Sequence, residues 1–147
     1  MSNSRSTALN AGVSDSAPPV PVAAQPPLVL VVEDDPCVAD VVAHLLTRHG
    51  HRVVRAADGA EASRCFATHE KVLSLALIDC GLPDIDGVAL ARVIRKLAPD
   101  LPIVMTSGWD NADARALTEH GPTVFLQKPF FPADVVKVVR NSLAARA

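Results

Sequence analysis

The stretch Leu28-Val-Leu-Val-Val-Glu-Asp-Asp-Pro36 decides the fold. A run of apolar residues leads into three consecutive carboxylates and a proline. A short, unbroken apolar run is typical of a strand that is buried on both faces of a parallel sheet, and Pro36 favours the first turn of a helix directly after it. The stretch therefore predicts a strand followed by a helix, with Glu33 and Asp34 at the carboxyl end of the strand.

Short strands and amphipathic helices alternate along the rest of the chain in the same way. Strands are predicted over 28–32, 52–56, 74–78, 102–106 and 123–127, and helices over 36–49, 58–69, 86–97, 110–120 and 132–145. This alternation indicates an α/β fold in which helices join parallel strands. Because such crossovers are right-handed, the units should form an open, doubly wound sheet with helices on both faces.

Length and composition limit the domain organisation. A chain of 147 residues with 49% hydrophobic content is large enough for one domain with a buried core. Residues 1–27 are rich in Ser, Ala and Pro and lack apolar periodicity, so we expect a disordered tail or linker there and the domain over 28–147. The 3 cysteines lack C-x-x-C spacing and clustered histidines, which indicates reduced thiols rather than disulfides or zinc ligands.

Charge and hydropathy argue against two kinds of partner. A formal net charge of -2, with 20% charged residues, offers no broad basic surface, so we expect no direct binding of nucleic acid and no membrane contact. No apolar run approaches the roughly 20 residues that span a bilayer, and the N-terminus lacks the pattern of a secretion signal. These features predict a cytoplasmic location.

Polar side chains follow four of the five predicted strands. Glu33 and Asp34 follow the first strand, Asp79 the third, Ser107 the fourth and Lys128 the fifth. Ligands of doubly wound sheets bind at the carboxyl ends of the strands, so these side chains should converge. Asp79 could attack a phosphoryl group, and Mg²⁺ would suit the cluster of carboxylates. Lys128 and Ser107 would then stabilise charge on the phosphoryl oxygens.

Four motifs in this order resemble the receiver domain of bacterial two-component response regulators. They are Val31-Val-Glu-Asp-Asp-Pro36, Ile78-Asp-Cys-Gly-Leu-Pro-Asp-Ile-Asp-Gly87, Met105-Thr-Ser-Gly108 and Lys128-Pro-Phe130. The resemblance covers about residues 28–145. It implies a flavodoxin-like (βα)5 fold with a five-stranded parallel sheet in the order 2-1-3-4-5.

The resemblance also implies a phosphoacceptor and a metal site. By position, Asp79 is the residue that takes the phosphoryl group. Asp34 and Asp79 would bind Mg²⁺ directly, Glu33 would act through a water molecule, and the backbone carbonyl of Gly81 would complete the protein ligands. The donor would be the phosphohistidine of a histidine kinase or of an Hpt-type relay protein.

The resemblance also implies a switch that involves the fourth and fifth strands. Ser107 matches the switch Ser/Thr of the family, and Phe125 matches the switch aromatic residue. Lys128 matches the phosphate-binding lysine, whose bond to Pro129 is usually cis. On phosphorylation Ser107 would move toward the phosphoryl group and Phe125 into the space vacated. The predicted helix near 110–120, the fifth strand and the last helix would then present a changed surface to an unknown downstream protein.

Two residues beside the predicted site depart from common patterns and bear on the lifetime of the phosphoryl group. Gly81, two residues past Asp79, would leave a gap for water. Trp109, two residues past Ser107, could cover the site with an apolar ring. Our hypothesis is that Trp109 shields Asp79 and slows autodephosphorylation.

Several alternatives stay open at this stage. The chain could be a stand-alone regulator or the receiver of a hybrid histidine kinase; either would be no enzyme beyond self-catalysed phosphotransfer and autodephosphorylation. A pseudo-receiver that is not phosphorylated is the main alternative. A Mg²⁺-dependent phosphohydrolase of the haloacid dehalogenase type is less favoured, because its nucleophile lies in a D-x-D motif at the first strand. The helix near 110–120, with Arg115 and Glu119, could form a phosphorylation-dependent dimer face.

Overall fold

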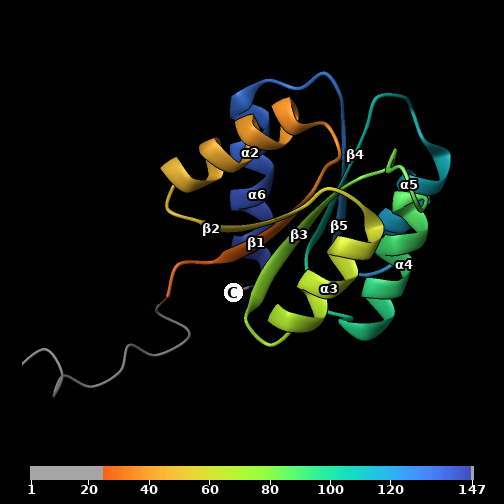
Figure 1. Cartoon of the computed structure of the whole chain (residues 1–147), viewed down its shortest axis with the longest axis horizontal. Helices are drawn as coiled ribbons and strands as arrows, with labels where there is room; N and C mark the ends of the chain where they lie inside the picture. Colours follow the sequence, from red (N-terminus) through yellow and green to blue (C-terminus); the bar gives the residue numbers. More distant parts are fainter. Residues whose placement is uncertain (1–24, 147) are drawn as a thin grey trace, which may run out of the picture.

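An open parallel sheet forms the centre of the molecule (Figure 1). The computed structural model describes residues 25–146, so the prediction of a disordered tail lies outside the described residues for positions 1–24. The strands are β1 (Leu28–Val32), β2 (Arg52–Ala56), β3 (Leu73–Asp79), β4 (Ile103–Ser107) and β5 (Thr123–Gln127). They pair in the order β2-β1-β3-β4-β5, which confirms the predicted fold class and strand order.

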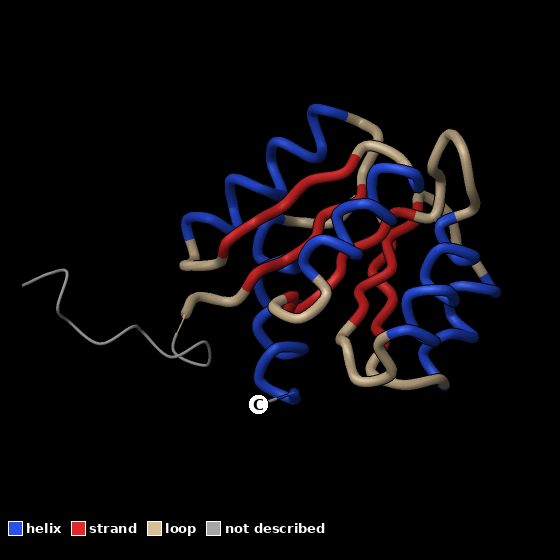
Figure 2. The backbone as a smooth tube through the Cα atoms, turned by 60° about the horizontal axis from the view of Figure 1, so that its bottom comes forward, coloured by secondary structure: helices blue, strands red, loops and turns tan. Residues whose placement is uncertain are grey.

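Helices cover both faces of the sheet. Helices α2 (Pro36–Arg48) and α6 (Pro132–Arg146) lie on one face, and α3 (Gly59–His69), α4 (Gly87–Leu97) and α5 (Ala112–Ala116) lie on the other. Figure 2 shows the strands enclosed between these two layers. Each face has its own apolar cluster, to which alternate residues of β1, β3 and β4 contribute. Because these central strands are buried on both faces, their sequences are unbroken apolar runs.

Most elements differ from their predicted bounds by no more than one residue at an end, and two of the differences bear on the site or on its surroundings. Strand β4 ends at Ser107, one residue later than predicted. Helix α5 has only 5 residues and continues as a 3-10 turn over Leu117–Glu119, whereas a continuous helix was predicted over 110–120. Its buried side chains are Ala114 and Leu117. Helical stability in proteins comes mainly from packing. Two buried side chains provide too little packing to stabilise a continuous helix over 110–120.

The strand order places one crevice at the carboxyl edge of the sheet. The chain leaves β1 for α2 on one face and leaves β3 for α4 on the opposite face. Since β1 and β3 are neighbours, the two connections diverge and leave the ends of these strands open, which is where doubly wound folds bind ligands. Glu33, Asp34 and Asp79 lie at this point.

Candidate functional site

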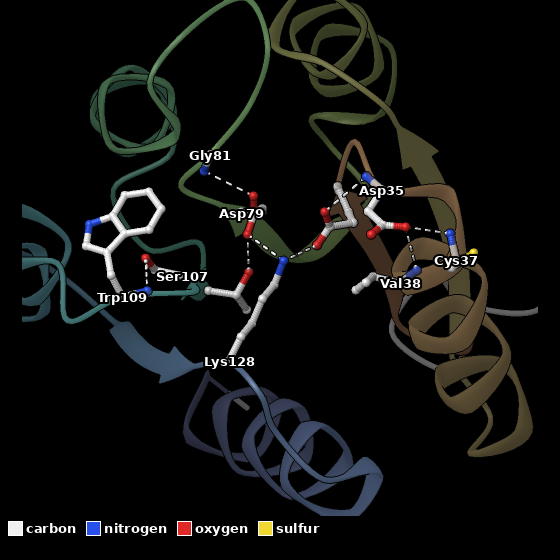
Figure 3. Close-up of polar contacts among 10 residues, drawn as sticks. Asp35, Cys37, Val38, Asp79, Gly81, Ser107, Trp109 and Lys128 are labelled. Carbon is white, nitrogen blue, oxygen red and sulfur yellow. Dashed lines mark hydrogen bonds and ion pairs between the residues drawn. The ribbon is translucent and has the colours of Figure 1, made fainter.

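Asp79 is the centre of the polar cluster at the carboxyl edge of the sheet (Figure 3). It is the last residue of β3 and is only 5% exposed. Its Oδ1 accepts from the Nζ of Lys128 at 2.8 Å and from the Oγ1 of Thr106 at 3.3 Å. Its Oδ2 accepts from the backbone N–H of Gly81 at 3.0 Å. Both oxygens of a buried carboxylate are therefore held by donors from separate segments of the chain.

Lys128 joins the two buried carboxylates of the site. Its Nζ lies 2.8 Å from the Asp79 Oδ1 and 2.8 Å from the Glu33 Oε1. Burial alone would lower the pKa of Lys128, but the hydrogen bonds and charges of Asp79 and Glu33 outweigh it and raise that pKa. Lys128 therefore stays protonated. The peptide bond between Lys128 and Pro129 is cis, as the resemblance implied.

Glu33 and Asp34 complete the acidic part of the site. Glu33 is 4% exposed; burial raises its pKa, and hydrogen bonds from Lys128 and the Asp35 N–H oppose that effect. Asp34 is exposed to solvent. One carboxylate oxygen from each of Glu33, Asp34 and Asp79 lies within 4.8 Å of the others.

This set of oxygens fits a hard divalent cation. Ligands of an octahedral Mg²⁺ lie within about 4.2 Å of one another, only slightly closer than the carboxylate oxygens do here. The cluster has three carboxylates, and its single ammonium group, that of Lys128, pairs with Glu33 and Asp79. The site therefore has an excess of negative charge that a cation would neutralise. The exposure of Asp34 leaves room for the water ligands that Mg²⁺ retains. The carbonyl of Gly81 as a further ligand stays a prediction.

The structure corrects the sequence analysis at the end of β4. The hydroxyl that reaches Asp79 belongs to Thr106, the register partner of Asp79, and not to Ser107. Side chains of a strand alternate between the two faces of the sheet, so a strand end misplaced by one residue assigns the wrong hydroxyl. Ser107 instead accepts from the Trp109 N–H at 3.2 Å. It lies beside Cys80, whose pKa is raised to about 11, chiefly by burial.

Trp109 borders the site, as its position suggested. A Cβ placed on Gly81 would lie 3.8 Å from the Cη2 of Trp109, so the indole ring is in reach of the segment that follows Asp79. Figure 3 shows Trp109 on the side of Asp79 opposite Asp35. The residue is 54% exposed. The shielding of Asp79 by this ring stays a prediction.

Phe125 lies on the face of the sheet that is covered by α5. It is half-buried and packs against the apolar cluster of that face. The guanidinium carbon of Arg115 lies 4.6 Å from the centre of the Phe125 ring. This contact involves one of the two residues considered for a dimer face, so Arg115 is engaged within its own chain.

Gly87 was not singled out from the sequence, although the site depends on it. A Cβ at this position would lie 2.1 Å from the Asp79 carbonyl oxygen and 2.7 Å from the Cα of Cys80. Only glycine lets α4 begin directly against the end of β3. The available signal was a glycine at the start of a predicted helix, where it lowers helix propensity without an evident reason.

The fold and the site define a CheY-like signalling domain, and comparisons with known proteins agree. The response regulator receiver domain family matches residues 29–140. The chain therefore belongs to this family. Within residues 25–146, no helix is long and apolar enough to cross a membrane.

Individual relatives show how far the likeness extends. Transcriptional regulatory protein PrrA of Mycobacterium tuberculosis is 38% identical over 124 residues, which cover 82% of this chain and 51% of PrrA. A putative response regulator from Chloroflexus aurantiacus is 36% identical with a TM-score of 0.72, over 82% of this chain and 99% of that structure. A CheY-like receiver domain protein from Methanospirillum hungatei is 25% identical with a TM-score of 0.76, over 83% and 97%. The chain spans about half the length of the first curated relatives it matches.

Proposed function

We propose that Asp79 accepts a phosphoryl group from the phosphohistidine of a histidine kinase or an Hpt-type protein. The main support is that a buried carboxylate lies within hydrogen-bond distance of an ammonium, a hydroxyl and a backbone N–H. An Asp79 oxygen would attack phosphorus, forming an O–P bond as the P–N bond breaks, and the imidazole would leave with the electron pair. The product is an acyl phosphate.

The surrounding residues would stabilise the transferred group. Lys128 would pair with one phosphoryl oxygen, and the Thr106 hydroxyl would donate to another, the role first given to Ser107. Glu33, Asp34 and Asp79, with the carbonyl of Gly81, would hold Mg²⁺. The bound ion would neutralise charge on the phosphoryl oxygens.

The added phosphoryl group would act as a switch. It brings about 1.5 to 2 negative charges to the edge of the sheet, which would attract Thr106 and Lys128. Phe125 would then change its packing, because it lies on the strand next to β4 and is only half-buried. The surface formed by α5, β5 and α6 would be the one that a downstream protein or a second copy of the chain recognises.

The lifetime of the phosphoryl group would depend on Gly81 and Trp109. Gly81 offers no side chain to exclude water from Asp79. The indole of Trp109 lies within contact distance of the space that such a side chain would fill. Trp109 would therefore take over part of the shielding.

Phosphorylation is tested by intact mass after incubation with Mg²⁺ and acetyl phosphate. The parent should gain one phosphoryl group, about 80 Da, only when Mg²⁺ is present, and Asp79→Asn should gain none. Asp84→Asn is the matched control, since Asp84 caps α3 from the loop after β3 and should leave the gain intact. No gain in the parent would favour the pseudo-receiver alternative.

The roles of the two hydroxyls are separated by the rate of the same reaction. Thr106→Ala removes the donor that reaches Asp79 and should slow the mass gain by about tenfold or more, the effect of losing a hydrogen bond to a charged group. Ser107→Ala should leave the rate within about twofold. The reverse result would restore Ser107 as the switch hydroxyl.

A further inference from the structure

Arg115 is held between a carboxylate and an aromatic ring. Its Nε donates to the Asp110 carboxylate in the loop before α5, and its guanidinium carbon lies 4.6 Å from the centre of the Phe125 ring. Asp110 and Arg115 are both more than half exposed at their side chains. The three residues form a stack across the outer surface that connects the loop, α5 and β5.

This stack is continuous with the proposed phosphorylation site. Asp110 directly follows Trp109, whose indole borders Gly81 beside Asp79. The Trp109 N–H also donates to Ser107 at the end of β4 at 3.2 Å. A shift of the segment after β4 would therefore move Asp110 and strain its ion pair with Arg115.

We propose that Asp110 and Arg115 form a latch that holds Phe125 in the conformation described here and opposes phosphorylation. The inference rests on the proposed function of Asp79. A guanidinium is attracted to the face of an aromatic ring only while it lies over that face, so a Phe125 ring that moves inward loses Arg115. Any phosphoryl analogue that favours the moved state must first break this contact, which lowers its apparent affinity.

The test uses beryllofluoride, which mimics a phosphoryl group on aspartate in the presence of Mg²⁺. Trp109 is the single tryptophan of the chain and borders the site, so its fluorescence should report binding. Arg115→Gln should lower the apparent dissociation constant about two- to fivefold, as expected for an exposed cation–π contact. Asp110→Asn should also lower the apparent dissociation constant, but by less than Arg115→Gln does. Arg92→Gln, an exposed arginine of α4, is the matched control and should leave it unchanged.

The outcomes separate the latch from the proposed function. If the Trp109 fluorescence of the parent shows no Mg²⁺-dependent response to beryllofluoride, the proposed function and the latch are both overturned. If the parent and Arg115→Gln bind with equal affinity while Asp79→Asn does not bind, the proposed function stands and the latch is overturned. In a Phe125→Leu background, Arg115→Gln should have no further effect, because the ring on which the latch acts is gone.

Discussion

Helices α4 and α5 follow neighbouring strands and cover the same face of the sheet, but they are held very differently. Helix α4 has 11 residues and five of them are buried. Helix α5 has 5 residues, of which Ala114 alone is buried, and the following turn adds Leu117. Segments with few buried apolar contacts open at lower free energy. The β3–α4 region (residues 73–97) therefore serves as a fixed support. The β4–α5 region, which is the segment after the fully buried strand β4 (residues 108–119), can move.

Polar contacts add to the same difference. Arg95 of α4 donates to the carbonyl oxygens of Leu101 at 2.6 Å and Pro122 at 3.1 Å, and to the Thr123 hydroxyl at 2.9 Å. These bonds tie the end of α4 to the starts of β4 and β5. In the β4–α5 region the side-chain ion pair is the exposed one between Asp110 and Arg115. An exposed pair contributes little to stability, so it can be broken when the domain switches.

Core truncations should show the largest difference between the two regions. Ile94→Ala in α4 removes a fully buried side chain and should lower the free energy of unfolding by about 2–5 kcal/mol. Leu117→Ala should cost at most about 2 kcal/mol, because the short segment around it can collapse into the space. Urea denaturation measures both. Equal losses would contradict the distinction between fixed and movable regions.

Glycine substitutions should give the next largest contrast. Gly87→Ala places a Cβ 2.1 Å from the Asp79 carbonyl oxygen and should destabilise the fold by about 1–3 kcal/mol through displacement of the backbone. At Gly108 a Cβ meets nothing within 4 Å, so Gly108→Ala should stay within about 0.5 kcal/mol of the parent. The same denaturation experiment applies. A Gly87→Ala protein as stable as the parent would show that the start of α4 can shift.

Removal of Trp109 should affect the rate of phosphoryl loss rather than stability. Trp109→Ala opens the site to water and should shorten the lifetime about three- to tenfold, equivalent to about 0.7–1.4 kcal/mol in the barrier. The decay of the phosphorylated mass over time measures it. Phe131→Ala is the control, because Phe131 is an exposed aromatic residue. An unchanged or longer lifetime in Trp109→Ala would remove its shielding role.

The smallest effect should come from His51, which precedes β2. Burial lowers the pKa of His51, and the charges of His49 and Arg140 lower it further. The unfolded chain therefore takes up a proton at a higher pH than the folded protein does, and stability should fall as pH drops through about 6.5. Below the pKa of the folded state the loss stops growing. In His51→Gln the stability measured from pH 7.5 to 5 should vary less with pH than in the parent.

The fold could be predicted from the sequence because the patterns that indicate each strand and helix lie within that element. Buried strands require unbroken apolar runs, and a carboxylate or lysine directly after such a run lies at the carboxyl edge whatever the exact register. Asp79, Glu33 and Lys128 were placed correctly for this reason. The choice between Thr106 and Ser107 depends on strand register, which is set by pairing with β3 and is not visible in β4 alone.

The features that the sequence did not show depend on contacts between elements. Gly87 matters because α4 starts against the backbone of β3. The sequence of α4 contains no pattern that indicates this close contact. The shortening of α5 reflects how little of it reaches the core. The position of Arg115 over Phe125 likewise requires α5 and β5 to be placed side by side.

Amide hydrogen exchange with and without Mg²⁺ and beryllofluoride tests the central claim most directly. The account predicts that the additive changes exchange in residues 107–127 and leaves α4 almost unchanged, because the β3–α4 region supports the site while the β4–α5 region responds. Asp79→Asn should show no change in either region. Changes as large in α4 as in α5, or changes that persist in Asp79→Asn, would contradict the account.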